Sequence, residues 1–350
     1  MVIFAIERHH YNEGEDMKRR DFLKVGSAGL SGSLLGGAGL LSWIPRAHAA
    51  TISKTFYITD GSITQVDGTS VYFRGFSSSA SQLNVPGESI ILQEGDTVEI
   101  TIVNTLSSSH SFVIDGLVDS GTISGGQTRT VSFTASNAGS YLFYDKLNAP
   151  YNRLVGLHGG FAVMPAGSSD ELYAGSPRFV QQLFWVFNDI DPVWHDRIRR
   201  GRIPNTAYEP RYFSLNGMTG RPPGHPENTD PNINPMKNPD TILKGRIGDR
   251  SLIRIMNAGL AAQSVHAHGN HVEWLTENGQ IRPDIWLKDC LYLDGDMGAL
   301  DAIYPFEVPP DSWPPATHGE YPMHLHSEMS QTAAGGYYMF GAITEIYFVE

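Results

Sequence analysis

The chain has 350 residues, of which 41% are hydrophobic and 18% are charged, a composition typical of a folded globular protein with room for two domains. Its formal net charge of -12 argues against a protein that binds the nucleic acid backbone, because such proteins carry clustered excess cation. The single cysteine, Cys290, excludes an intramolecular disulfide framework, thiolate zinc clusters and iron–sulfur sites.

The first fifty residues have the features of an export signal. The pair Arg19-Arg20 precedes a Gly- and Leu-rich apolar stretch, and Ala47-His48-Ala49 has the small-x-small pattern that a signal peptidase recognises. We therefore predict a twin-arginine signal that starts at about Met17, with an upstream extension before it, and a periplasmic or secreted protein. No later segment approaches 18 uninterrupted apolar residues, so we expect no transmembrane segment in the mature chain.

Two segments share one β pattern. Residues 95–104 and 248–257 each begin with Gly-Asp, continue with alternating apolar and polar side chains, and end in Asn. This period of two predicts half-buried strands that are entered through a turn. Each segment is followed within ten residues by a histidine, His110 in the first case and His266 in the second.

Further apolar runs and turn-rich stretches complete the organisation of the chain. Convincing amphipathic helices are scarce, and short strands separated by turns indicate two β-sandwiches. Further strands are predicted at Thr128–Ala135, Gly139–Tyr144, Gly160–Met164, Gln182–Asn188 and Gly341–Val349, and loops at 166–180, 217–240 and 308–315. We expect a first domain at 51–166, a linker at 167–180 and a second domain at 181–350.

Two His-x-His pairs, His266-Ala267-His268 and His324-Leu325-His326, indicate a metal site. Residues i and i+2 of a strand share a face, so each pair can direct two imidazoles toward one ion. Neutral imidazole suits copper, zinc, iron or nickel, and intrinsic affinity favours copper. The predicted ligands are His110, His266, His268, His324 and His326.

The remaining candidate side chains receive weaker assignments. His158 and His271 stay open as ligands, and Met323 and Met329 are expected in the core rather than on a metal. Solvated loop positions are expected for His195, His225 and His318. Cys290 is expected to be a buried core residue, far from the His-x-His motifs. Candidates for orienting an imidazole or moving protons are Glu273, Asp115 and Glu328, and Tyr144 and Asp145 are placed in the same pocket.

With these motifs the chain resembles the cupredoxin-fold multicopper oxidases. The motifs that carry the resemblance are the two Gly-Asp strands, Gly139–Tyr144, Ser214-Leu215-Asn216-Gly217, His266-Ala267-His268-Gly269 and the stretch 323–342. The resemblance implies an all-β fold of two cupredoxin-like Greek-key β-sandwich domains. It also implies the two-domain laccase and nitrite reductase branch, whose members assemble as trimers with copper between domain 1 of one subunit and domain 2 of the next.

Departures from the family pattern predict a reduced copper content. At the positions of the blue type 1 copper ligands the chain has Gln263, Leu325, Ser330 and Ala342. The first paired-His motif survives only as His110, with Phe112 as its partner, and the second reads Tyr144-Asp145-Lys146. By position, His110 and His266 resemble type 2 ligands, and His268, His324 and His326 resemble type 3 ligands. We expect one mononuclear type 2-like copper, bound by three or four of these imidazoles at a domain or subunit interface, and no type 1 copper.

Three functional hypotheses follow. The first is an exported copper-dependent oxidoreductase that acts on a small-molecule substrate or oxygen through a non-blue copper. The second is a non-catalytic copper-binding or scaffold cupredoxin, like an exported, copper-free cell-division relative of the multicopper oxidases. The third is a cupin-type dioxygenase, because His266, His268 and Glu273 approximate the first cupin motif. The sequence leaves the substrate open, and also whether an electron-transfer partner replaces the missing blue copper.

Overall fold

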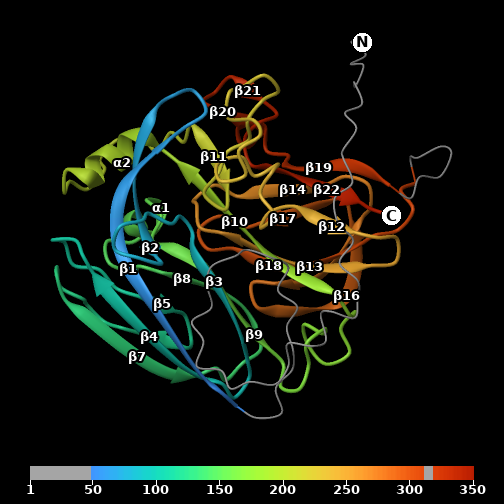
Figure 1. Ribbon diagram of the computed structural model, residues 1–350, viewed down its shortest axis with the longest axis horizontal. Helices are drawn as coiled ribbons and strands as arrows, with labels where there is room; N and C mark the ends of the chain where they lie inside the picture. Colours follow the sequence, from blue (N-terminus) through green and yellow to red (C-terminus); the bar gives the residue numbers. More distant parts are fainter. Residues whose placement is uncertain (1–48, 311–317) are drawn as a thin grey trace, which may run out of the picture. The chain divides into compact units, whose positions relative to one another are not determined.

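The computed structural model describes residues 49–310 and 318–350, which form an almost entirely β fold (Figure 1). The predicted export signal and part of the Pro-rich loop lie outside the described residues. Among these residues the α-helices are α1 (Tyr151–Leu154) and α2 (Pro192–Arg199), with one short 3₁₀ segment, η2 (Glu328–Gln331). Among the described residues, the helices are too short to span the hydrocarbon core of a bilayer.

Residues 51–164 form two sheets that face each other. The first has the strand order β2-β1-β4-β7, and the second has the order β3-β9-β8-β5-β6. Their bounds are β1 Thr51–Thr64, β2 Ser70–Ser77, β3 Gly87–Gln93, β4 Thr97–Asn104, β5 Val113–Ile114, β6 Val118–Asp119, β7 Thr128–Thr134, β8 Gly139–Tyr144 and β9 His158–Met164. The orders are not sequential, as expected for Greek-key connections.

Residues 181–348 form a second pair of sheets. One has the order β11-β10-β13-β18-β15-β16, and the other has the order β12-β22-β19-β14-β17. Their bounds are β10 Gln181–Ile190, β11 Tyr212–Leu215, β12 Leu243–Gly245, β13 Arg250–Asn257, β14 Gln263–Ala267, β15 Val272–Glu277, β16 Gln280–Lys288, β17 Cys290–Leu293, β18 Ala299–Pro305, β19 Gly319–Leu325 and β22 Ile343–Phe348. A small hairpin adds β20 (Thr332–Ala333) and β21 (Tyr337–Tyr338).

The alternating pattern of residues 95–104 is confirmed in β4. Val98, Ile100 and Ile102 are fully buried in the core of the first sandwich, whereas Glu99 between them is exposed. The strand pairs with β1 on one side and β7 on the other, so its apolar face lies inside one continuous sheet. The other predicted strands and the loops at 166–180 and 217–240 are also present.

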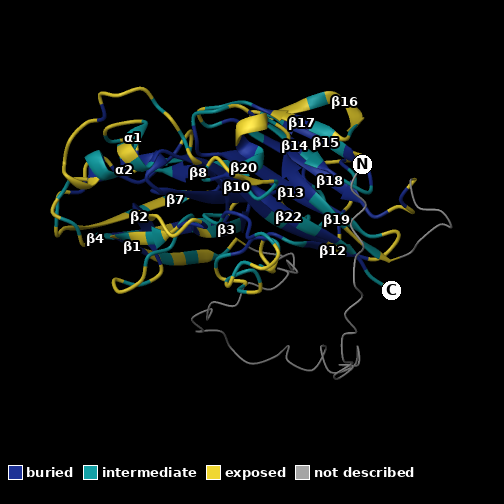
Figure 2. Ribbon diagram, turned by 90° about the horizontal axis from the view of Figure 1, so that it is seen from above, coloured by how far each residue is buried: buried dark blue, intermediate teal, exposed yellow. Residues whose placement is uncertain are grey.

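The second copy of the pattern differs, because β13 is buried on both faces (Figure 2). Ile253 and Ile255 join the core between the two sheets of the second sandwich. On the opposite face, Leu252 lies in a hydrophobic cluster with Met164, and Met256 lies in another cluster with Leu142. Met164 and Leu142 both belong to the first sandwich. The prediction of a half-buried strand is therefore wrong here, because the two sandwiches cover both faces of this central strand.

Candidate metal centre

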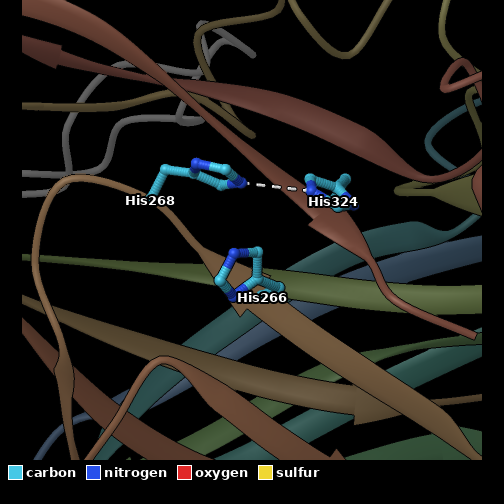
Figure 3. A group of neighbouring side chains, drawn as sticks. All are labelled: His266, His268 and His324. Carbon is cyan, nitrogen blue, oxygen red and sulfur yellow. Dashed lines mark hydrogen bonds between the residues drawn. The ribbon is translucent and has the colours of Figure 1, made fainter.

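Three histidines from two neighbouring strands converge on one point (Figure 3). His266 lies on β14, His268 follows its last residue, and His324 lies on β19. The two strands are antiparallel, with His266 directly opposite His324. Val265 and Ala267 on β14, which alternate with the histidines, are buried in the core. The period of two therefore directs the imidazoles to the other face of the sheet, as the His-x-His spacing predicts.

The imidazoles of this histidine cluster present nitrogens at metal-binding separation. One nitrogen of each ring lies within 4.8 Å of those of the other two. The Nε2 atoms of His268 and His324 are 3.2 Å apart. Two imidazole nitrogens bound at about 2.0–2.1 Å to one tetrahedral ion are separated by about 3.3–3.4 Å. The spacing therefore fits a shared ion.

Backbone carbonyls orient two of the rings. The Nδ1 atom of His266 lies 2.8 Å from the carbonyl oxygen of Asp289, and the Nδ1 atom of His324 lies 3.0 Å from that of Leu325. An Nδ1–H that donates to a carbonyl fixes the tautomer and leaves Nε2 with its lone pair for a metal. Burial, together with the neighbouring imidazoles His266 and His326, lowers the pKa of His324 and so favours its neutral, metal-binding form.

The other two predicted ligands stand apart from this cluster. His326 is exposed, and its ring centroid lies 5.0 Å from that of His266, but its nitrogens are not within the 4.8 Å group. His110 is fully buried in the first sandwich, and both of its ring nitrogens are occupied. Its Nδ1 lies 2.6 Å from Asp145 Oδ2, and its Nε2 lies 2.8 Å from Ser108 Oγ. The structure therefore does not bring His110 together with the histidine cluster.

The position of Cys290 corrects the expectation of a core residue far from the histidines. The side chain is partly exposed, and β17 places Cys290 directly opposite His266. The amide of Ala267 donates to the carbonyl of Asp289, so His266 and Cys290 form a non-hydrogen-bonded antiparallel pair, the type with the closer side chains. The thiol therefore lies on the same sheet face as the histidine cluster, although Cys290 is not a member of the 4.8 Å group.

The candidate carboxylates have other partners. Glu273 on β15 forms an ion pair with Arg250, and it lines a cavity of about 250 Å³ that also contains His271. Asp115 is exposed and accepts a hydrogen bond from the Tyr144 hydroxyl at 3.1 Å, and its charge adds to burial in raising the pKa of Tyr144 to about 12. Glu328 is exposed at the start of η2.

Some of the remaining histidines and methionines are buried or exposed differently from the prediction. His195 was expected to be solvated, but it is buried on α2, where its Nδ1 contacts the carbonyl of Tyr72 at 2.6 Å. His225 is partly buried against the carbonyl of Val66, whereas His318 is exposed as expected. His158 is buried, with its Nδ1 against the carbonyl of Arg153. Met323 is in the core as predicted, but Met329 is 59% exposed.

The positions that differ from the family pattern are occupied by buried side chains without a thiol. Leu325 belongs to the hydrophobic core of the second sandwich, and its amide donates to the carbonyl of Ala342. Gln263 and Ser330 are also buried, and the side-chain oxygen of Gln263 has no hydrogen-bond partner among the described residues. No histidine or cysteine stands at these four positions.

Sequence reasoning missed the Ser108–His110–Asp145 arrangement. Asp145 was predicted to line the copper pocket, at a position where the family pattern has a histidine pair, and Ser108 was given no role. The available signal was a histidine in a serine-rich loop and a lone aspartate 35 residues later, and only the fold places them in contact.

Comparison with known proteins finds that the chain is similar to several copper proteins. Residues 65–168 match the multicopper oxidase family model. The chain is 23% identical over 270 residues to the copper-containing nitrite reductase of Rhizobium meliloti. This alignment covers 69% of this chain and 65% of the nitrite reductase, just under two thirds of its length. A solved multicopper oxidase, mgLAC, superposes with a TM-score of 0.65 at 20% identity, covering 85% of this chain and 86% of that one. A copper nitrite reductase from Nitrosomonas europaea gives a TM-score of 0.60 at 19% identity, covering 86% and 94%.

Proposed function

Because this chain is a cupredoxin-like relative of the multicopper oxidases, we propose that it is an exported copper-dependent oxidoreductase with one mononuclear, type 2-like copper. His266, His268 and His324 would hold the ion, and the observation that supports this choice is the convergence of their ring nitrogens within 4.8 Å. The donor set fits copper, because three neutral imidazoles suit this metal and intrinsic affinity favours it. Bound there, copper would supply a Lewis acid and a one-electron redox centre.

Backbone groups of this chain orient two of the three proposed ligands. The carbonyls of Asp289 and Leu325 hold two imidazoles in the tautomer that leaves Nε2 available. His326, which is exposed beside the cluster, is the nearest further imidazole for a substrate or proton. His110 is left out of the ligand set, because Asp145 and Ser108 already engage its ring nitrogens.

Metal analysis tests the ligand assignment. Purified protein loaded with copper should retain about one ion per chain, give a type 2 electron paramagnetic resonance signal and lack intense blue absorption. His266→Ala and His324→Ala should each lose most of this copper while keeping cooperative unfolding. His318→Ala is the matched control, since this exposed histidine lies outside the cluster. Unchanged copper in both cluster variants would refute the assignment, and strong blue colour would refute the type 2 character.

A non-catalytic copper-binding or scaffold cupredoxin is the second candidate. Of the three carboxylates proposed for proton transfer, Glu273 pairs with Arg250, Asp115 pairs with Tyr144, and Glu328 is exposed at the start of η2. The pairing of Glu273 with Arg250 also leaves the cupin alternative without its carboxylate ligand. Turnover by the copper-loaded protein with phenolic donors and oxygen, or with nitrite and an electron donor, separates the two candidates. Bound copper without turnover of either kind would favour the second.

We carry the homotrimer over from the family resemblance as part of this proposal. Its support in this chain is an edge strand, β16, that leaves large apolar side chains in solvent, among them Ile285, Trp286 and Leu287. A contact between copies would remove this surface from water. Light scattering on the purified protein measures the mass directly, and a monomer would refute the trimer without affecting the copper assignment.

A further inference from the structure

We propose that Ser108, His110 and Asp145 form a nucleophile–base–carboxylate triad for acyl transfer, separate from the copper site. The Oγ of Ser108 lies 2.8 Å from Nε2 of His110, and Nδ1 of the same ring lies 2.6 Å from Oδ2 of Asp145. Both distances are those of direct hydrogen bonds. The order serine–Nε2, Nδ1–carboxylate is the one in which an imidazole acts as general base for a serine hydroxyl.

The carboxylate of Asp145 is held so that it can only accept. Besides the imidazole, four donors reach its two oxygens, namely the amides of Ser111 and Leu147, the Ser111 hydroxyl and the Asn152 side chain. Both His110 and Asp145 are fully buried, so water does not compete for these bonds. A carboxylate with these donors requires Nδ1 to carry the proton. The neutral ring then has its lone pair on Nε2, and the Ser108 hydroxyl donates to it.

The serine stands at the surface end of this network. Ser108 is partly exposed, and its neighbours Ser107 and Ser109 are exposed, in the loop that follows β4. Within the described part of the chain, the backbone amides of these three serines donate no hydrogen bond. They are available to an oxyanion that forms beside Ser108.

Two contacts fix the loop that carries the serine. The side-chain amide of Asn104 donates to the carbonyl of Ser108 at 2.8 Å. Gly125 packs so closely that an added Cβ would lie 2.3 Å from the carbonyl oxygen of Ser107. The loop is therefore held against the rest of the sandwich, which orders Ser108 relative to the imidazole before any substrate binds.

The reaction is the hydrolysis of an activated ester or similar acyl compound. Ser108 Oγ forms a bond to the carbonyl carbon while Nε2 of His110 takes the hydroxyl proton. The carbon–oxygen bond of the ester then breaks, and the imidazolium returns its proton to the leaving alkoxide. Water, activated by the same imidazole, cleaves the acyl-serine and releases the acid. No electron is transferred, so the reaction is independent of copper.

A fluorophosphonate ester is the probe that tests this proposal, applied to chelator-treated protein so that loss of the copper site cannot affect the result. The expected product is one adduct per chain on Ser108, located by peptide mass spectrometry. Ser108→Ala should abolish it, whereas Ser107→Ala and Ser109→Ala, which remove exposed hydroxyls of the same loop, should keep it. No adduct on folded protein, or equal labelling of the three serines, would overturn the proposal.

The imidazole and the carboxylate need a second set of variants. His110→Gln should slow labelling by on the order of 10²–10⁴-fold, the usual contribution of a general base. Asp145 is a positioning residue, and Asp145→Asn should slow labelling similarly, because an amide favours the wrong ring tautomer. Ser120→Ala removes a buried hydroxyl of the same sandwich that bonds only the backbone of Phe112 and Gly121, and it should leave the rate nearly unchanged. If Ser120→Ala and Asp145→Asn slowed labelling equally, in proportion to the fall in their melting temperatures, the network would be structural and the triad refuted.

Discussion

Two fully buried histidines, His158 and His195, make the stability of this protein sensitive to acid. Burial lowers the pKa of each to about 4, because the imidazolium cannot be hydrated there. In the unfolded chain the same groups titrate near 6.5. Both rings are neutral in both states above that value, so their effect on stability begins only as the pH falls below it. Between about pH 6.5 and 4 the unfolded state binds more protons, and the folded state loses stability.

We predict that His195→Gln reduces this acid sensitivity. Each histidine should contribute about 2.5 kcal/mol to the loss in free energy of unfolding between pH 7 and pH 4.5, from the linkage of a pKa near 4 to one near 6.5. Urea titrations at the two pH values measure the loss, which should be smaller by about this amount in the variant. His318→Ala, which changes an exposed ring, should leave the loss as it is. An unchanged loss in His195→Gln would show that this ring is not the acid-sensitive group.

The neighbourhood of Cys290 gives a second prediction at this scale, which rests on the proposed copper site. The thiol lies across from His266 but outside the group of converging nitrogens, so it should be shielded by bound copper without being a ligand. Cys290→Ser should therefore retain the full copper content, and alkylation of Cys290 should be slower in copper-loaded than in chelated protein. Loss of copper in Cys290→Ser would instead make the thiolate a ligand.

Side-chain spacing explains which parts of the site the sequence could predict. The pairs at 266–268 and 324–326 could be read, because a period of two along a strand is a local property. The pairing of β14 with β19, which brings His324 opposite His266, is not local. The Asp145 contact of His110 and the position of Cys290 opposite His266 likewise depend on strand register. The sequence alone therefore grouped His110 with the other four histidines, without its contacts to Ser108 and Asp145, and placed Cys290 far from them.

At the scale of the element, β13 is the strand whose surroundings differ most from the expectation. Its position in the chain matches the Gly-Asp pattern, but the alternation predicted that one of its faces is in solvent. The first sandwich covers that face, and the core of the second sandwich covers the other. Arg254 occupies that covered face, where its guanidinium donates to Ser140 Oγ at 2.6 Å and to Gln182 Oε1 at 2.8 Å. Asp301 Oδ1 lies 3.8 Å from it. A charged residue in such a strand gives no sequence signal of burial, because its partners come from distant strands.

We predict that Arg254→Met destabilises the protein by about 3–5 kcal/mol, because it leaves Asp301 buried without its cation. Adding Asp301→Asn should recover part of this loss, since the amide carries no charge. Arg199→Met is the control, as its ion pair with Asp196 is solvent-exposed and its loss should leave the free energy of unfolding nearly unchanged. Urea unfolding measures all three, and a cost below about 1 kcal/mol for Arg254→Met would contradict the argument.

At the scale of the whole molecule, the predicted export signal can be compared with where the fold begins. Local sequence patterns predicted the strands and the loops. Which residues at the start of the described chain are required for folding depends instead on contacts with distant strands. The amide of Ala50 donates to Asp96 Oδ1 at 2.8 Å, and its carbonyl accepts from Thr97. Strand β1 then pairs along its first eight residues with β4. Among the described residues, this anchored position directly follows the predicted cleavage motif Ala47-His48-Ala49.

We predict that a chain starting at Ala50 keeps the melting temperature of the full-length protein, whereas a chain starting at Thr59 does not fold. The shorter chain loses Phe56 and Ile58, which are fully buried in the core of the first sandwich, and the entire pairing of β1 with β4 along Thr51–Ile58. Removing two such side chains costs about 2–5 kcal/mol each, which with the lost strand pairing exceeds the stability of a typical domain. Calorimetry on both truncated chains measures the difference. A cooperative transition in the shorter chain would show that β1 is dispensable, and a lowered melting temperature in the longer one would show that the residues before Ala50 contribute to the fold.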